Sequence, residues 1–426
     1  MLDPKKIRED PDAVRRGAQK KRLQVDGVLS RVLELDQKRR KLQHEKDELK
    51  AEQARLGKNI AKLQGEERSK LMQQTGEMSD RLKSLEAQFS EAEEEWGRLL
   101  LNIPNIPDPE VPDGETDKDN VEIKRWGEPR KFGFEPKDHL SLGEHLDLID
   151  IPRATKLAGS RTYILKNEGA LLELAVLQYT LEYLRKQGFG PMIVPTLVRR
   201  EAMVGTAYFP GGEEQAYTCE KDDLYLIGTS EVPVTAYHSG EILEEKELPK
   251  LYAGYSTCYR REAGAAGKDT KGLYRIHQFS KVEQVVICRA DEAESKRFHQ
   301  FILANAEAVL VALGLPYRVV NVCGGDLGAA QVQKFDIETW MPSRGGYGET
   351  HSASRFYDFQ ARRLNLRYRD AHGKMKFCHT LNNTAIASPR ILIAILENYQ
   401  EADGSVEVPA VLRPYLGGQT HIRKKG

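Results

Sequence analysis

The chain has 426 residues, 40% of them hydrophobic and 30% charged, and its 64 basic residues equal its 64 acidic ones. This length favours two or three domains with a sizeable core, and the zero net charge argues against a globally basic nucleic-acid binder. The five cysteines contain no Cys-x-x-Cys pair, which argues against a disulfide framework or a zinc ribbon and favours a reducing compartment.

The first residues show no apolar signal region, and no run approaches about 18 apolar residues. We therefore expect a cytoplasmic protein without a membrane span.

Two heptad patterns occupy the N-terminal region. In the first, an apolar residue recurs at every seventh position: Val28, Leu35, Leu42, Leu49, Leu56 and Leu63. The second follows Gly65-Glu66-Glu67 and contains Leu71, Met78, Leu85, Ala92 and Leu99, joined by Thr75, Leu82, Phe89 and Trp96. A narrow apolar seam is typical of a long helix that packs on another helix. We expect a break at 65–67 within an antiparallel helical hairpin over about 28–99.

The two expected helices differ in charge. Residues 31–62 include ten basic and six acidic residues, whereas residues 66–98 include five basic and nine acidic ones. The residues alone leave three interpretations open: a solvated coiled coil, a dimerisation zipper, or an arm whose basic helix contacts an RNA backbone.

A proline-rich segment follows the second heptad pattern. Residues 102–120 contain four prolines and many acidic side chains. Proline disfavours a helix interior. We expect an extended linker without helix that separates a domain at 1–101 from a second domain at 121–426.

Helix and strand signals open the second domain. Residues 168–187 have leucines at helical spacing and end at Gly188, and a strand at 191–194 is closed by Pro195. A second apolar strand, 224–227, leads into Gly228-Thr229-Ser230-Glu231, where Thr or Ser before Glu is typical of a capped helix start.

Residues 257–284 are the most informative stretch, and they are typical of strand, loop and strand. Because strand side chains alternate between faces, we expect Arg260 and Glu262 on one face of the first strand. Arg275, Phe279 and Glu283 are expected on one face of the second. Two arginines, a ring and two carboxylates suit an anionic ligand. A loop that closes over it is suggested by Gly264, Gly267, Lys268, Lys271 and Gly272. A hairpin with ordinary surface charges is the alternative.

Two further segments carry ligand-binding chemistry. Glu349 and Ser352 follow a glycine-rich approach and offer hard oxygen ligands for Mg²⁺ beside a triphosphate. Small residues over 381–389 lead to Arg390, in the first turn of an apolar helix that continues over 391–400. The closing segment 408–416 is expected to be a strand that packs on the core.

Together these segments resemble the class II aminoacyl-tRNA synthetases, in the form found in the seryl-tRNA synthetase family. The longest match is with motif 2, through YRREAG at 259–264 and GLYRIHQF at 272–279. The helix and strand over 168–194 resemble motif 1, the dimer-forming element. Residues 381–400 resemble motif 3, although Ala, Ala and Ser-Pro stand where the general pattern has glycines.

The resemblance implies an α+β fold: an antiparallel sheet flanked by helices, preceded by a long coiled-coil hairpin, in a homodimer. It also implies a ligase that activates L-serine with ATP and transfers it to tRNA(Ser), and to tRNA(Sec) where that is present. The hairpin would grip the long variable arm of the tRNA. Mg²⁺ is expected and zinc is not.

Roles for individual residues also come from the resemblance. It implies three catalytic residues: Arg260, Glu262 and Arg390. Serine would be bound by Thr229, Ser230, Glu231, Arg260, Glu283 and Thr384. ATP would be bound by Arg260, Arg261, Glu262, Arg275, Ile276, Phe279, Glu349, Thr350, His351, Ser352 and Arg390, with Glu349 and Ser352 holding Mg²⁺. No separate chemical role is assigned to His351.

Three alternatives remain. A ligase that activates an amino acid for a protein carrier would have no need of the basic helix. A non-catalytic paralogue is disfavoured by the joint presence of Arg260, Glu262, Glu283, Glu349 and Arg390. Specificity for another amino acid within class II is the third.

Overall fold

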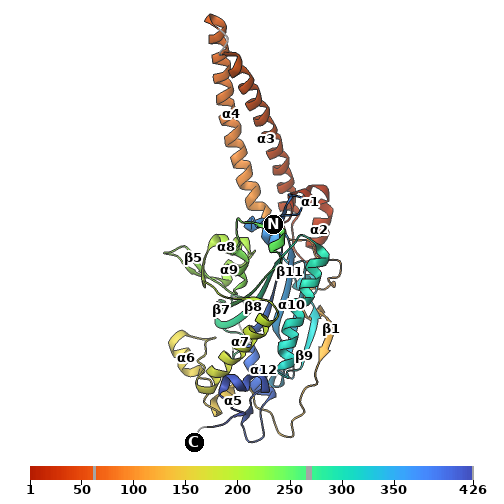
Figure 1. Cartoon of the computed structure of the whole chain (residues 1–426), viewed down its shortest axis with the longest axis vertical. Helices are drawn as coiled ribbons and strands as arrows, with labels where there is room; N and C mark the ends of the chain where they lie inside the picture. The colour runs from red at the N-terminus through yellow and green to blue at the C-terminus, as the bar shows by residue number, and fades with distance from the viewer. Residues whose placement is uncertain (61–63, 265–270, 425–426) are drawn as a thin grey trace. The chain divides into compact units, whose positions relative to one another are not determined.

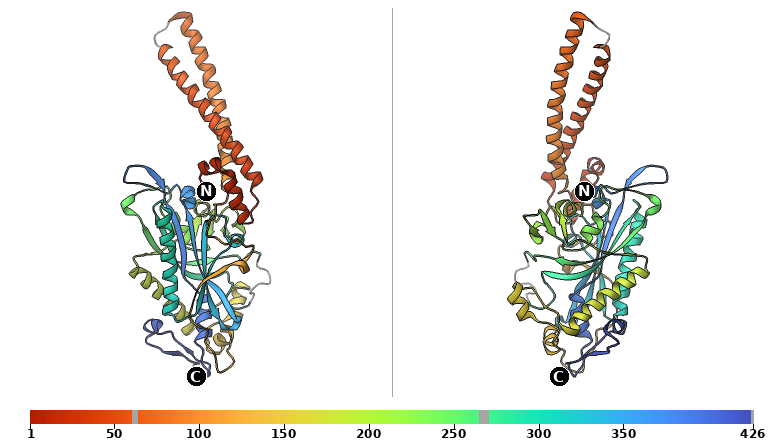
Figure 2. Two further views of the ribbon diagram at one scale, coloured as in Figure 1. Left: turned by 90° about the vertical axis from the view of Figure 1, so that its right-hand side faces the viewer. Right: turned by 60° about the vertical axis from the view of Figure 1, so that its left-hand side comes forward.

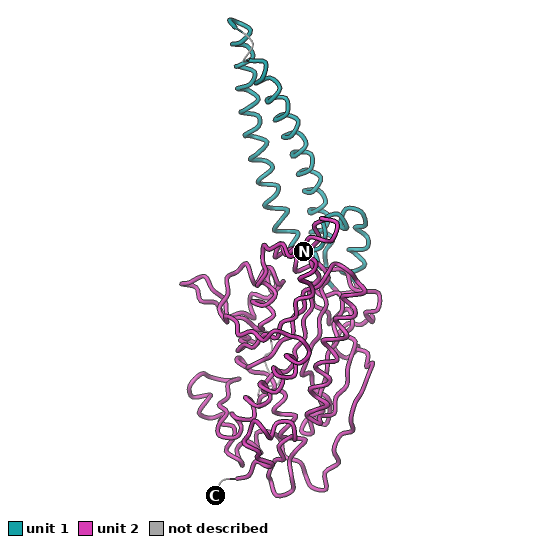
Figure 3. Tube along the Cα trace, in the orientation of Figure 1, with its two compact units in different colours: residues 1–19, 23–104 teal, residues 20–22, 105–426 magenta. Residues whose placement is uncertain are grey.

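The computed structural model describes residues 1–60, 64–264 and 271–424, so the predictions for Lys62, Leu63, Gly267 and Lys268 lie outside the described residues. The chain divides into two compact units, one of residues 1–19 and 23–104 and one of residues 20–22 and 105–426 (Figure 3). Within the described ranges, no helix is both long and apolar enough to cross a membrane.

The first unit is helical, and the predicted hairpin is confirmed. It consists of α3 (Asp26–Ile60) and α4 (Gly65–Leu100), which lie side by side (Figure 1). The expected break at 65–67 is wrong, because these residues form the first turn of α4. Two short helices that the sequence reasoning missed precede the hairpin: α1 (Pro4–Glu9) and α2 (Pro11–Lys20). Each begins with a proline, which is favourable in the first turn of a helix.

Cross-helix contacts set the antiparallel register of the hairpin. Arg31 pairs with Glu95 at 2.8 Å, and Lys50 pairs with Glu86 at 2.9 Å. The seam itself is buried at heptad positions near the base, such as Leu35, and becomes half-exposed further out. Part of the basic charge of α3 is therefore neutralised by α4 rather than free for a partner.

The second unit is built on an eight-stranded sheet, which Figures 1 and 2 show from three directions. Neighbouring strands are antiparallel except β2 and β7, which are parallel. The strand order is β1 (Val121–Trp126), β9 (Tyr317–Asn321), β10 (Gln333–Met341), β11 (Gly346–Tyr357), β14 (His379–Ala387), β8 (Gln278–Cys288), β7 (Lys250–Tyr259) and β2 (Gly190–Ile193). The α+β class with a mainly antiparallel sheet is confirmed.

Smaller elements surround this sheet. The remaining strands form one two-stranded and two three-stranded sheets: β15 (Val406–Glu407) with β16 (His421–Ile422), β13 (Met375–Phe377) with β12 (Arg367–Arg369) and β6 (Ile242–Glu244), and β3 (Leu197–Arg199) with β5 (Leu224–Leu226) and β4 (Tyr217–Cys219). The helices are α5 (His139–His145), α6 (Ile151–Ala158), α7 (Asn167–Lys186), α8 (Arg200–Gly205), α9 (Glu231–Ala236), α10 (Glu292–Ala312), α11 (Phe359–Leu364) and α12 (Arg390–Asn398). The elements predicted near 168–194 and 224–227 are thus present as α7, β2 and β5.

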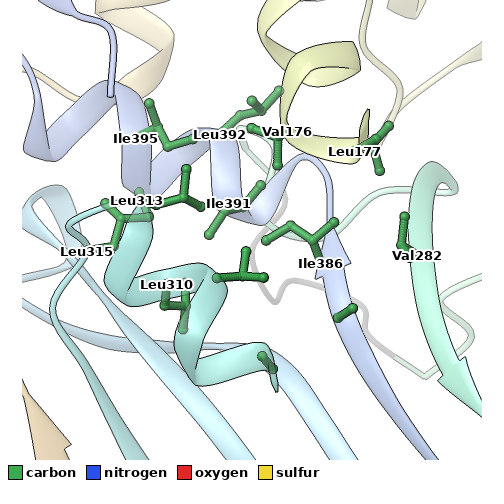
Figure 4. Close-up of a cluster of buried hydrophobic side chains, with 14 of the residues drawn as sticks. Val176, Leu177, Val282, Leu310, Leu313, Leu315, Ile386, Ile391, Leu392 and Ile395 are labelled. Carbon is green, nitrogen blue, oxygen red and sulfur yellow. The ribbon is translucent and has the colours of Figure 1, made fainter. Parts of the chain in front are cut away.

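One large apolar core joins α7, α10 and α12 to the sheet. Figure 4 shows Val176 of α7, Leu310 of α10 and Ile391 of α12 gathered beside Ile386 of β14 and Val282 of β8, and all five are buried. Burial of such side chains is the main stabilising term of a domain of this size. Helices on this face leave the opposite face of β8 for other contacts.

The proline-rich segment does not behave as a free linker. Asn105 donates hydrogen bonds to the carbonyls of Ala330 and Phe356, at 3.1 and 2.9 Å. Asp108 accepts from the buried Arg355 at 2.7 Å. The expectation of no helix is also wrong, because a 3₁₀ turn, η1 (Asp117–Asp119), follows the last proline.

The strand expected at 408–416 is also wrong. Residues Ala410–Leu416 form a 3₁₀ helix, η6, whose Leu412 is buried in the main core. Pro409 and Pro414 explain the difference, since proline cannot donate to a strand ladder.

Candidate functional site

One cavity collects most of the predicted ATP-binding residues. Its predicted lining residues are Arg260, Glu262, Arg275, Ile276, Phe279, Glu349, Thr350, His351, Ser352, Thr384 and Arg390. Of the other five, sequence reasoning missed Tyr274 and Lys281, whereas Ala387, Ser388 and Pro389 belong to the run of small residues noted before Arg390. Arg261 is not among the lining residues, and its side chain is exposed.

The two arms of motif 2 reach the cavity differently from the strand alternation expected. β7 ends at Tyr259 and β8 begins at Gln278, so Arg260, Glu262 and Arg275 lie outside both strands. Glu262 has a left-handed backbone with φ of 53°, and its carboxylate accepts from Arg275 at 2.7 Å. A turn and an ion pair therefore bring these side chains together, not a shared strand face.

The alternation expected on the second strand is present in β8. Phe279, Lys281 and Glu283 occupy alternate positions, while Val282 between them packs in the apolar core. The guanidinium of Arg260 lies 5.3 Å from the centroid of the Phe279 ring. One strand thus separates the core from a row of ring, ammonium and carboxylate.

A β-bulge explains how Glu349 and Ser352 reach the same cavity. Residues three apart on a regular strand point to opposite faces. Here Glu338 of β10 pairs with Glu349 and the preceding Ile337 pairs with His351, so Thr350 is the extra residue. The bulge shifts the alternation by one and returns both oxygen-bearing side chains to one side.

Arg390, the first residue of α12, makes hydrogen bonds to two other segments that line the cavity. It donates to the carbonyl of Tyr274 at 3.0 Å and to that of Glu349 at 2.7 Å. Its guanidinium also lies 3.5 Å from the Glu349 carboxylate and 4.4 Å from the Tyr274 ring centroid. Burial alone would raise the pKa of Glu349, but the nearby cations, first of all Arg390, hold that pKa below its ordinary value. Glu349 is therefore ionised at neutral pH.

A second polar cluster surrounds Glu231, the first residue of α9. Its carboxylate accepts from Gln360 at 2.8 Å and from the hydroxyl of Tyr208 at 3.1 Å, two partners that sequence reasoning missed. Burial, and then the negative charge of Glu283, raise the pKa of Glu231 to about 7. A buried carboxyl near its pKa has a strong preference for a cationic ligand.

The other predicted serine-binding residues divide into two kinds. Thr384 donates to Glu283 at 3.4 Å, and the Lys281 ammonium contacts the same carboxylate. Ser230 is fully buried and donates to the carbonyl of Gly254 at 2.9 Å, so its hydroxyl has a structural partner. Thr229 accepts from the backbone N–H of Glu231 at 3.1 Å. The predicted capped helix start is wrong, because the N-cap residue of α9 is Ser230 and its side chain makes no capping hydrogen bond.

His351 is fully enclosed beside Glu349. Its Nδ1 lies 2.8 Å from the hydroxyl of Thr350. Burial lowers the pKa of His351 to about 4, so the ring is neutral at physiological pH. The structure gives it the character of a buried packing residue with polar contacts to Thr350 and to the backbone of Ala385.

Comparison with known proteins covers nearly the entire chain. Residues 1–107 match the family described as the seryl-tRNA synthetase N-terminal domain, and residues 217–399 match the tRNA synthetase class II core domain of the G, H, P, S and T enzymes. A serine–tRNA ligase of Deinococcus radiodurans is 49% identical over 419 residues, with 98% of each chain covered.

Solved structures agree. The crystal structure of seryl-tRNA synthetase from Pyrococcus horikoshii complexed with ATP has a TM-score of 0.94 and 41% identity, with all of both chains covered. The cytoplasmic serine–tRNA ligase from Naegleria fowleri in complex with AMP has a TM-score of 0.87 and 33% identity, covering 98% of this chain and 96% of that one. The resemblance seen in the motifs is thereby confirmed, and the chain belongs to the seryl-tRNA synthetase family of class II ligases.

Proposed function

We propose that this protein joins L-serine to tRNA in two steps. The serine carboxylate attacks the α-phosphorus of ATP and pyrophosphate leaves; the 3′-terminal ribose hydroxyl of tRNA then takes the seryl group. The observation that carries this proposal is the cavity itself, where three arginines meet an oxygen pair, a stacking ring and the ammonium of Lys281. Positioning and charge stabilisation account for catalysis here, so no protein nucleophile is required.

For ATP, the contacts support the roles implied by the motifs. Arg260 would hold the α-phosphate and the serine carboxylate, and Phe279 would stack on the adenine. Glu262 would accept from the adenine amino group while Arg275, its ion-pair partner, binds the outer phosphates with Arg390. Ile276, Thr350 and His351 also line this cavity, whereas Arg261 would have to bind from its edge.

Mg²⁺ fits the oxygen pair created by the bulge. Glu349 offers an ionised carboxylate and Ser352 a hydroxyl on the same side of β11. When bound, the ion neutralises charge on the triphosphate and orients it for in-line displacement. The protein contributes the fixed positions of these two ligands.

The serine pocket would combine Glu231, Glu283, Thr229 and Thr384, with Arg260 at the carboxylate end. The buried carboxylates suit an ammonium group, and the hydroxyl groups suit the serine side chain. A pocket that hydrogen-bonds the serine hydroxyl discriminates against alanine by about 10⁴–10⁵, because the buried partners would otherwise stay unpaired.

The hairpin would bind the tRNA, with residues 1–101 as the RNA-binding part and 121–426 as the catalytic part. Arg31, Arg39 and Lys50 already pair with glutamates of α4. The exposed Lys38 and Lys41 remain on α3 as candidates for phosphate contacts. The tRNA partner would be tRNA(Ser), and tRNA(Sec) where it is present.

A homodimer is supported by exposed apolar side chains near motif 1. Leu157 is 77% exposed and Leu174 59%, an unusual state for large apolar residues that lie close together around one groove. Sedimentation analysis tests the dimer.

A cytoplasmic location is supported by the five cysteines, none of which is in a disulfide.

ATP–pyrophosphate exchange with each of the twenty amino acids, in the presence of Mg²⁺ and without tRNA, tests the first step. Exchange with serine alone is expected. Exchange with another amino acid would overturn the specificity, and no exchange with any amino acid, alone or with added tRNA, would favour a non-catalytic paralogue. Charging of tRNA rather than of a carrier protein tests the second step.

A further inference from the structure

Lys281 is the one lysine that lines the ATP cavity within the described residues, and the family motifs assigned it no role. Its side chain is only 5% exposed, and its ammonium contacts the carboxylate of Glu283, which is 2% exposed. A lysine buried to this degree needs a reason, because taking its charge out of water is energetically unfavourable.

The position of Lys281 along β8 matches the order of groups in an aminoacyl adenylate. Phe279, Lys281 and Glu283 point to the same side at successive alternate positions. Alternate residues on a strand are about 6.6 Å apart. With adenine on Phe279 and the serine ammonium at Glu283, the ammonium of Lys281 falls level with the bond between phosphate and carboxylate.

The charges around Glu283 support the same conclusion. Glu283 is paired with Lys281. Burial, and then the charge of Glu283, raise the pKa of Glu231 to about 7, and the charge of Lys281 acts in the opposite direction. Serine brings an ammonium that competes with Lys281 for Glu283, and a carboxylate that has no partner there except cations.

We propose that Lys281 acts as a substitute ammonium that serine displaces. Without serine it neutralises Glu283; when serine binds, the substrate ammonium takes that carboxylate and Lys281 turns to the serine carboxylate and the α-phosphate. Lys281 keeps its proton throughout: the carboxylate oxygen forms the bond to the α-phosphorus, and the bond to the pyrophosphate oxygen breaks with its electron pair. This inference rests on the proposed placement of serine at Glu283.

Because Lys281 exchanges Glu283 for the substrate carboxylate, the site favours a zwitterion, a ligand that carries both an ammonium and a carboxylate. A ligand that has the ammonium but lacks the carboxylate must displace Lys281 without offering it a new partner, so it binds poorly. Serinol, which is 2-amino-1,3-propanediol, is such a ligand.

The test measures the KM for serine in pyrophosphate exchange and the inhibition constant of serinol for three enzymes: wild type, Lys281→Met and Lys281→Gln. We expect both variants to raise the KM for serine about 10-fold or more, the scale of a lost hydrogen bond to a charged group. Both should bind serinol more tightly than the wild type does, because Glu283 is then free. Lys250→Met, on neighbouring β7 and paired with Glu247 outside the cavity, is the matched control and should change neither value.

A higher KM for serine together with a lower inhibition constant of serinol would support the exchange of partners by Lys281. Parallel weakening of both ligands would show a merely structural lysine and overturn the proposal, as would no change in either. Glu283→Gln separates this from the serine assignment: if that variant leaves the KM for serine unchanged, the placement of serine at Glu283 is wrong, and the failure lies there.

Discussion

Two lysine–glutamate pairs show how differently the arm and the cavity use charge. Lys50 and Glu86 join α3 to α4 with side chains that are 52% and 45% exposed, whereas the side chains of Lys281, which lines the cavity, and its partner Glu283 are 5% and 2% exposed. Water screens the first pair, so it adds little to stability. The second pair has given up its hydration and interacts strongly with anything charged that enters. The same pair of residue types sets the helix register in one region and, in our proposal, selects the ligand in the other.

Shortening the arm should have the largest effect, because it should remove tRNA charging and leave serine activation in the cavity intact. Replacing residues 44–88 by a four-residue Gly-Ser turn keeps the buried base of the hairpin near Leu35 and removes its outer part. We expect tRNA charging to fall about 10³-fold or more through lost phosphate contacts, with serine-dependent pyrophosphate exchange unchanged.

Charging assays at two salt concentrations check this. Retained charging would show that the outer arm is not the RNA grip, and a change of oligomeric state in sedimentation would support the dimerisation zipper instead.

Arg260→Ala tests the cavity. Removing a preorganised cation from the reacting phosphate should lower serine-dependent pyrophosphate exchange by about 10²–10³. Near-normal exchange in this variant would contradict the assignment of the site. Arg261→Ala, the exposed neighbour, is the matched control and should have a much smaller effect.

Glu231 should make serine binding depend on pH. Burial raises its pKa to about 7 from an ordinary value of 4.5, so the ionised form that attracts ammonium is lost as the pH falls through 7. The KM for serine should rise by up to about 10-fold per pH unit below 7, and Glu231→Gln should remove this dependence. A parallel pH profile in both enzymes would contradict the assignment.

The same shift affects folding with the opposite sign. Because the folded-state pKa of Glu231 is raised, the stability that its neutral form contributes is complete below 4.5 and is lost as the pH rises through 7. Thermal unfolding of Glu231→Gln should therefore gain on the wild type as the pH increases.

The smallest effect is expected in the arm. Lys50→Gln removes an exposed cross-helix ion pair, and we expect no measurable change in the thermal unfolding midpoint. Glu86→Gln should behave in the same way. A drop of several degrees in either variant would mean that this exposed ion pair stabilises the arm far more than we expect of a pair screened by water.

Local hydrophobic patterns and sequence motifs account for most of the predictions that were confirmed. The heptads predicted the hairpin, and helical spacing predicted α7 and α12 to within a residue or two at their starts. The segments that failed share one cause: local signals did not report their tertiary partners. Residues 102–120 looked like a linker, yet Asn105 and Asp108 are held by distant residues of the second unit.

The sequence by itself determined the family, the helical arm and the identities of the cavity's arginines and carboxylates, because these depend on residue type and spacing. Only the tertiary structure decided how they meet. The bulge at Thr350 turned Glu349 and Ser352 to one side, and a left-handed Glu262 reached Arg275 from outside the strands. The sequence did not predict the contacts of Lys281, Tyr208 and Gln360. Whether a side chain becomes the partner of a buried carboxylate depends on segments that lie far apart in the chain.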